Sequence, residues 1–69
     1  MTKFIEYTDK QGCRSLVSLN LVDTVADNNK TIILSVNKES ITLAIAYETF
    51  TAWIKDGDKS PILSAGTAL

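Results

Sequence analysis

Histidine is absent from this 69-residue chain, and cysteine occurs once, at Cys13. A single cysteine excludes an intrachain disulfide, and with it the class of small disulfide-stabilised secreted domains. Zinc sites need several histidine or cysteine ligands, which one chain of this composition does not have. The commonest acid–base group of enzymes at neutral pH is missing as well. We therefore expect no metal, no cofactor and no enzymatic activity.

Long apolar runs and an excess of one charge are also missing. Seven Lys and Arg stand against eight Asp and Glu, a formal net charge of −1. That balance argues against a protein that binds nucleic acid mainly by neutralising phosphates. No apolar stretch approaches the length of a membrane span, and "MTKFIEYTDK" lacks the apolar segment of a secretory signal. These absences predict a cytoplasmic protein, in a cell or in an infected host.

The composition, 45% apolar and 22% charged, is typical of one folded globular domain. At this length an ordering cost of about 1.5 kcal/mol per residue nearly cancels the hydrophobic gain. With disulfides and zinc excluded, we expect additional stability to come from association of the chain with itself or with another protein.

Alternating apolar and polar residues predict a first strand over residues 2–8. A turn ending in Gly12 leads to a second strand over residues 13–19, so the two form a hairpin. The next segment does not alternate cleanly, and we expect a kinked connection with one helical turn capped by Asn20. A third strand then covers residues 24–27.

The asparagines of "DNNK" favour a tight hairpin turn into a strand over residues 31–36. "NKES" forms the next turn, and "ITLAIA", residues 41–46, forms the last strand. From Tyr47 the period is helical, and Gly57 is placed to end the helix. The remaining segment, residues 58–69, contains proline, glycine and small polar residues and is expected to be a flexible C-terminal tail.

Together these elements predict an α+β domain over residues 1–57. Its fold is an antiparallel meander of four to five strands with one C-terminal helix packed on the sheet.

Three segments carry a family resemblance: the opening "FIEYTDKQG", then "SLNLVDTV", and a strand that runs directly into a helix at "YETFTAWI". In this order they resemble the small FlbD-type flagellar proteins and similar phage-encoded orphan proteins, over roughly residues 3–54. Ala46 departs from the pattern, because those proteins have a capping serine or acidic residue there. The resemblance implies a small sheet with one helix and a regulatory or binding role, and it carries over no functional residues.

The helix bears an aromatic stripe. At 100° per residue Tyr47, Phe50 and Ile54 share one face and are predicted to be core. Trp53 lies at the margin of that face, where a half-buried indole is typical of an interface anchor. The alternative is that the indole only covers the edge of the sheet.

The strand "ITLAIA" is a second candidate surface, because it carries no charge. If it is an edge strand, its unpaired backbone groups and its residues Ile41, Leu43 and Ile45 are expected to bind a partner. If it is central, the same reasoning moves to "TIILSV".

The sequence thus predicts a small non-enzymatic binding or regulatory protein acting by stoichiometric protein–protein interaction, as a phage-type accessory or inhibitor protein would. The expected partners are further copies of the chain and a foreign protein. The alternative is a nucleic-acid-binding small β-sheet or barrel, in which Phe4 and Tyr7 would stack on bases, although they lie on opposite faces of their strand. An enzyme would require composite sites between subunits.

Overall fold

The structure, a computed structural model, describes residues 3–56 and 60–69. Six strands, one short 3-10 helix and one α-helix lie in these residues. In chain order the elements are β1 (Phe4–Thr8), β2 (Arg14–Ser18), η1 (Leu19–Leu21), β3 (Val22–Asp27), β4 (Ile32–Val36), β5 (Glu39–Leu43), α1 (Tyr47–Lys55) and β6 (Ile62–Thr67).

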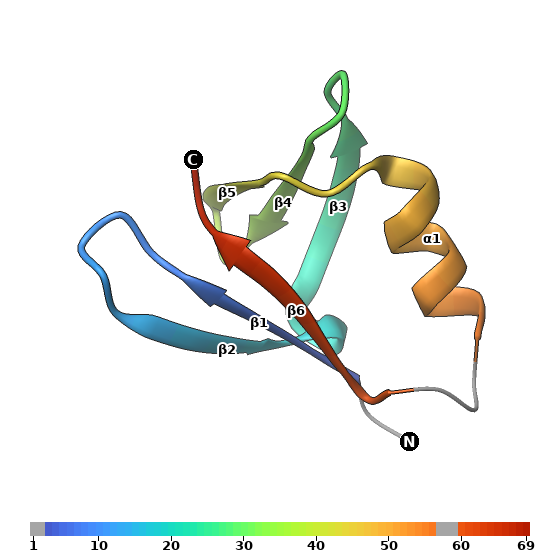
Figure 1. Ribbon diagram of the computed structural model, residues 1–69, viewed down its shortest axis with the longest axis horizontal. Coiled ribbons are helices and arrows are strands. Elements are labelled where there is room, and N and C mark those ends of the chain that lie inside the picture. The colour runs from blue at the N-terminus through green and yellow to red at the C-terminus, as the bar shows by residue number, and fades with distance from the viewer. Residues whose placement is uncertain (1–2, 57–59) are drawn as a thin grey trace.

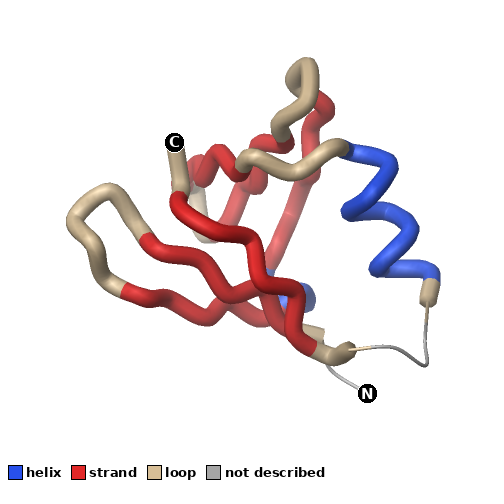
Figure 2. The backbone as a smooth tube through the Cα atoms, viewed as in Figure 1, coloured by secondary structure: helices blue, strands red, loops and turns tan. Residues whose placement is uncertain are grey.

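The strands form two three-stranded sheets, with the orders β2-β1-β6 and β3-β4-β5. Figure 1 shows the two sheets facing each other across the core, with α1 covering one side of the space between them. Figure 2 shows the same arrangement as a backbone tube, with strands in red and helices in blue. All strand pairs are antiparallel except β1 with β6. The predicted α+β class, largely antiparallel with a helix packed on the sheets, is confirmed.

Two tight turns build the β3-β4-β5 meander, as the asparagines predicted. Asn29 and Lys30 have positive φ values of 46° and 68°, and Asn37 and Lys38 have 50° and 68°. Two consecutive left-handed residues give a turn whose twist matches that of the flanking strands. Each turn therefore fixes the register of its hairpin.

The kinked connection between the two sheets is η1. Its first turn is capped by the Ser18 hydroxyl, which accepts a hydrogen bond from the amide of Asn20 at 3.3 Å. The sequence predicted that Asn20 caps the turn, which would then begin at Leu21, two residues after its observed start at Leu19. A serine hydroxyl is an equally good acceptor, and its earlier position starts the turn at Leu19.

The segment after α1 departs from the sequence prediction. A flexible tail was expected over residues 58–69, whereas the structure has β6 at Ile62–Thr67. This strand runs parallel to β1, with Phe4 beside Ile62 and Ile5 beside Leu63, and it buries Ala65. Its small residues give little apolar alternation, so the strand depends on pairing with β1 rather than on its own pattern. The predicted helix stop at Gly57 lies outside the described residues.

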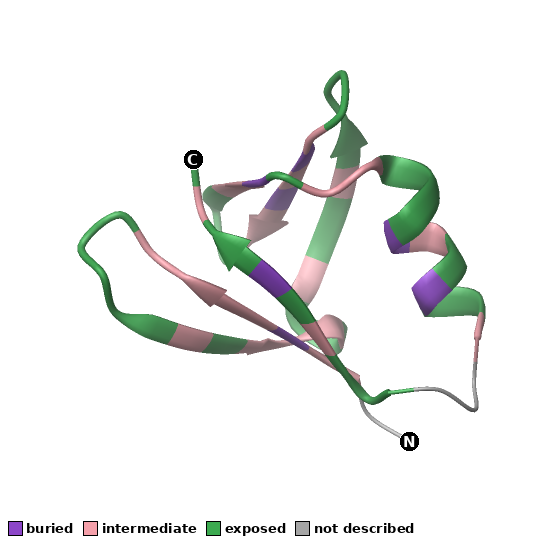
Figure 3. Cartoon of the chain, in the orientation of Figure 1, coloured by how far each residue is buried: buried purple, intermediate pink, exposed green. Residues whose placement is uncertain are grey.

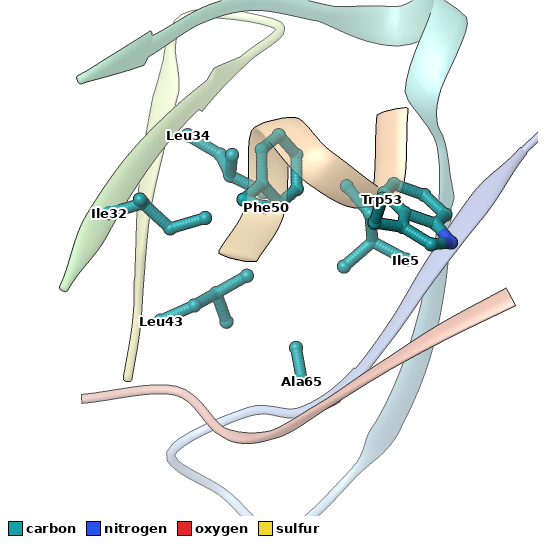
Figure 4. Close-up of a cluster of buried hydrophobic side chains, with 7 residues drawn as sticks. All are labelled: Ile5, Ile32, Leu34, Leu43, Phe50, Trp53 and Ala65. Carbon is teal, nitrogen blue, oxygen red and sulfur yellow. The ribbon is translucent and has the colours of Figure 1, made fainter. Parts of the chain in front are cut away.

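The core is a single cluster between the sheets and the helix, shown in Figure 4. It is formed by Ile5, Ile32, Leu34, Leu43, Phe50, Trp53 and Ala65.

The helix turns a different face inward from the one predicted. Only Phe50 and Trp53 of α1 are buried, as Figure 3 shows, while Tyr47 and Ile54 are 37% and 38% exposed. The rings of Phe50 and Trp53 pack with their centroids 5.7 Å apart. Burial of the large indole stabilises the domain more than burial of an isoleucine, so the helix is rotated toward Trp53.

Three segments distant in sequence meet at one corner of the domain, which we call the Lys3 corner: Lys3, Trp53, Ser60 and Pro61. The Lys3 ammonium donates to the carbonyl oxygens of Trp53 and, at 2.6 Å, of Asp56, at the end of α1. The Trp53 indole N–H donates to the Ser60 carbonyl at 2.9 Å. The amide of Phe4 donates to the Pro61 carbonyl at 2.8 Å, which begins the β1–β6 ladder. These bonds connect the start of β1, the end of α1 and the start of β6.

Candidate protein-binding edge

β5 is an edge strand, because its sheet has the order β3-β4-β5 and, within residues 3–56 and 60–69, only β4 pairs with it. From the sequence, Ile41, Leu43 and Ile45 were predicted to bind a partner if their strand lies at the edge of its sheet. From Ser40 to Ala46 the chain carries no charged residue. Edge strands are usually protected by charges or proline; β5 has one charge, on its first residue Glu39, so the rest of the strand is open to a further strand.

One hydrogen bond shows which backbone groups face away from β4. The amide of Leu69 donates to the carbonyl of Thr42 at 2.9 Å. The N–H and C=O of one strand residue point to the same side, and residues two apart share that side. The amides and carbonyls of Ser40 and Thr42 therefore point outward. Across the described residues, Leu69 is the one segment whose backbone bonds to this side of β5.

A groove of about 440 Å³ runs beside this edge. The loop between β1 and β2 forms one wall, and β5 forms the other. The chain after β6 lies across it, and Figure 1 shows that end of the chain close to β5. The lining residues are Tyr7, Asp9, Lys10, Gln11, Ser40, Ile41, Thr42, Ala68 and Leu69.

The charges of the groove have different roles. The carboxylate of Asp9 accepts hydrogen bonds at 2.9 Å from the amides of Gln11 and Cys13, and so it holds the loop in shape. Gly12 completes the turn with a φ of 86°, a conformation that favours glycine. Lys10 is exposed and forms no ion pair within residues 3–56 and 60–69. The rim of the groove therefore carries two charges of opposite sign, the hydrogen-bonded carboxylate of Asp9 and the exposed ammonium of Lys10.

The structure separates the four residues predicted to bind a partner. Ile41 lies in the wall of the groove. Ile45 is half-buried and packs against the core beyond the end of β5. Leu43 is fully buried.

Trp53, predicted from the sequence to anchor an interface, lies almost entirely within the core. The residue is only 9% exposed, and its indole N–H is already bonded to Ser60. Little of the side chain is therefore exposed to solvent, and its N–H donor is already used. The indole instead closes the core, since that position buries more apolar surface than the margin of the helix.

Sequence reasoning missed the residues that complete the groove, namely Tyr7, Lys10 and Leu69. They come from the first hairpin and from the last residues, and nothing in their local patterns connects them to β5. The only signal in the sequence was the uncharged run from Ser40 to Ala46.

Other kinds of site are not apparent in the part of the chain that is described. No group of three or more histidine, cysteine, aspartate or glutamate side chains is placed to hold a metal ion there. Cys13 is exposed in the loop between β1 and β2. Of the described helices, none has the length and apolar character needed to cross a bilayer.

Comparison with protein-family models, with curated proteins and with solved structures gives no significant match. The resemblance to FlbD-type proteins therefore stays a prediction, and a function has to be inferred from the geometry of this chain.

Proposed function

We propose that this chain is a small non-enzymatic binding protein that acts stoichiometrically through the edge of β5. An extended segment of a partner protein adds to the β3-β4-β5 sheet as a fourth strand. The observation that carries the proposal is the bond from Leu69 to Thr42, because it shows that the outer side of β5 accepts a backbone donor. A role as a phage-type accessory or inhibitor protein rests on the family resemblance alone.

The backbone of the partner would supply most of the affinity. Its amides and carbonyls would pair with those of Ser40 and Thr42, about 4.8 Å from β5, which is the usual mode of strand addition. The amide of Leu69 already occupies the carbonyl of Thr42. The partner strand must therefore either end beside Leu69 or displace it. The outward groups of Ser40 are open in either case.

The side chains of the partner would supply selectivity. Residues on a strand alternate between the two faces of the sheet, so every second side chain of the partner would enter the groove. Ile41, Ala68 and Leu69 offer apolar contact there, and Lys10 offers a positive charge at the rim. We therefore expect preferred ligands to combine an aliphatic residue with an acidic residue.

The test begins with peptides selected from a random-sequence library on the immobilised protein. Binders are then titrated into ¹⁵N-labelled protein, and amide exchange is measured with and without peptide. We expect the peptide to slow exchange at Ser40 and Thr42, and Thr42→Pro to abolish binding because it removes an outward donor.

A matched control is available on the other edge of the same sheet. Asn28 and Thr31 exchange both backbone hydrogen bonds, so Asp27, one residue earlier, points outward from β3. Asp27→Pro removes an outward donor there and should leave peptide binding unchanged. Selected peptides that protect neither Ser40 nor Thr42, or that bind the Thr42→Pro protein normally while both variants melt as folded domains, would refute the proposal.

A further inference from the structure

The segment after β6 lies on the same edge of β5 that is proposed to receive a partner strand (Figure 1). The amide of Leu69 donates to the outward carbonyl of Thr42 at 2.9 Å, and both Ala68 and Leu69 line the groove. A partner strand paired with β5 would place one of its own amides on that carbonyl. Leu69 thus makes, from within the chain, one of the backbone bonds that the partner would make.

Ala68 and Leu69 differ in how firmly they are held. The amide of Ala68 donates to the carbonyl of Thr8 at 2.7 Å, which extends the pairing of β6 with β1 beyond Thr67, and its side chain packs against the core. Leu69 is 58% exposed and is not among the described residues that pack against the core. Release of Leu69 would therefore cost one backbone hydrogen bond and leave β6 and the core in place.

We propose that Leu69 is an autoinhibitory latch for the edge of β5. It occupies the carbonyl of Thr42 while no partner is bound, and it moves away, with Ala68 as the hinge, when a partner strand pairs with β5. The latch rests on the proposed function, since it has a role only if β5 accepts a partner strand.

The short length of β5 favours displacement of Leu69 over a partner strand that ends beside it. Within β5 the outward backbone groups belong to Ser40 and Thr42, so a retained Leu69 would leave the partner little more than those of Ser40. Displacement exchanges one amide-to-carbonyl bond on Thr42 for another of the same kind, and the energies of the two bonds nearly cancel. The partner also gains the outward amide of Thr42 as a donor.

The strength of the latch follows from the single bond that closes it. One intramolecular hydrogen bond changes an equilibrium by a net factor of about 2 to 12. Because a partner can pair fully only with the open form, the latch should lower the affinity of the edge by about the same factor. Opening at Leu69 should also be frequent in the free protein, since it needs no unfolding of the strands.

Amide exchange of the free, ¹⁵N-labelled chain is the first measurement. We expect a protection factor at Leu69 of no more than about 12, below that of Ala68. Exchange at Leu69 as slow as that of the core strands would show that this residue is a fixed part of the fold, and would overturn the latch without any peptide or variant.

The second measurement adds a peptide selected on the wild-type protein. When the peptide binds, we expect exchange to become faster at Leu69 while it becomes slower at Ser40 and Thr42. Leu69→Pro removes the amide donor and should bind the same peptide about 2- to 12-fold more tightly. Leu69→Met is the matched control, because it keeps the donor and nearly the same side-chain volume, and it should bind like the wild type. Thermal melts check that both variants are folded.

The outcomes separate the latch from the binding site. Unchanged or slower exchange at Leu69 in a complex that protects Ser40 and Thr42 overturns the latch and leaves the edge of β5 as the binding site. So does a folded Leu69→Pro protein that binds no more tightly than Leu69→Met. Peptides that protect neither Ser40 nor Thr42 refute the proposed function, and the latch with it.

Discussion

Replacement of Lys3 by methionine should destabilise the domain far more than the loss of an ordinary surface charge. The Lys3 ammonium caps the end of α1 by donating to the carbonyls of Trp53 and Asp56, with a longer contact of 3.4 Å to Ile54. It also lies 4.9 Å from the centre of the Trp53 ring. Methionine keeps the aliphatic stem and removes only the charge and the donors.

The magnitude follows from these contacts. Hydrogen bonds from a charged donor contribute about 1.5–3 kcal/mol, and a cation near an aromatic ring about 0.5–1 kcal/mol at an exposed site. A positive charge at a helix C-terminus adds about 0.3–1 kcal/mol. The three effects share one ammonium group and do not add fully, so we expect a loss of about 2 kcal/mol. For a domain of this length, that corresponds to a decrease in Tm of about 8–16 °C.

Urea and thermal unfolding monitored by circular dichroism and by Trp53 fluorescence measure the effect. Lys55→Met is the control, since Lys55 is exposed in the last turn of the same helix and makes no ion pair within the described residues. We expect it to cost less than about 0.5 kcal/mol. If Lys3→Met unfolds at the same urea concentration as the wild type, or if the two variants lose equal stability, the Lys3 corner does not hold the helix as described.

Three further predictions concern single positions, each measured by urea unfolding. Trp53→Phe should cost at least about 1–2 kcal/mol, because the Ser60 carbonyl loses its donor; an unchanged midpoint would show that this bond is immaterial. Lys30→Gly and Lys38→Gly should each stabilise by up to about 1 kcal/mol, since both lysines have a φ of 68° that glycine adopts without strain, and a loss of stability would contradict this. Gly66→Ala should destabilise by about 1 kcal/mol through its φ of 71° alone, because no atom lies within 4 Å of the added carbon; a neutral result would mean that the backbone can relax there.

The parts of the fold that were predictable have local causes. Paired asparagine and lysine residues at Asn29 and Asn37 mark both turns of the meander, and the strands between them alternate or are continuously apolar. The helix begins at Tyr47 as its period indicated. In each case the residues that indicate the turn, strand or helix lie within that element or directly beside it.

The parts that were not predictable depend on contacts between distant segments. β6 is a strand because β1 pairs with it in parallel, and Phe4 and Ile62 are far apart in the chain. The inward face of α1 is decided by where Trp53 finds a partner, at Ser60, rather than by the helical period. The groove beside β5 could not be predicted for the same reason. Its second wall is the loop between β1 and β2 and its end is formed by Leu69, and both reach β5 only through tertiary contacts.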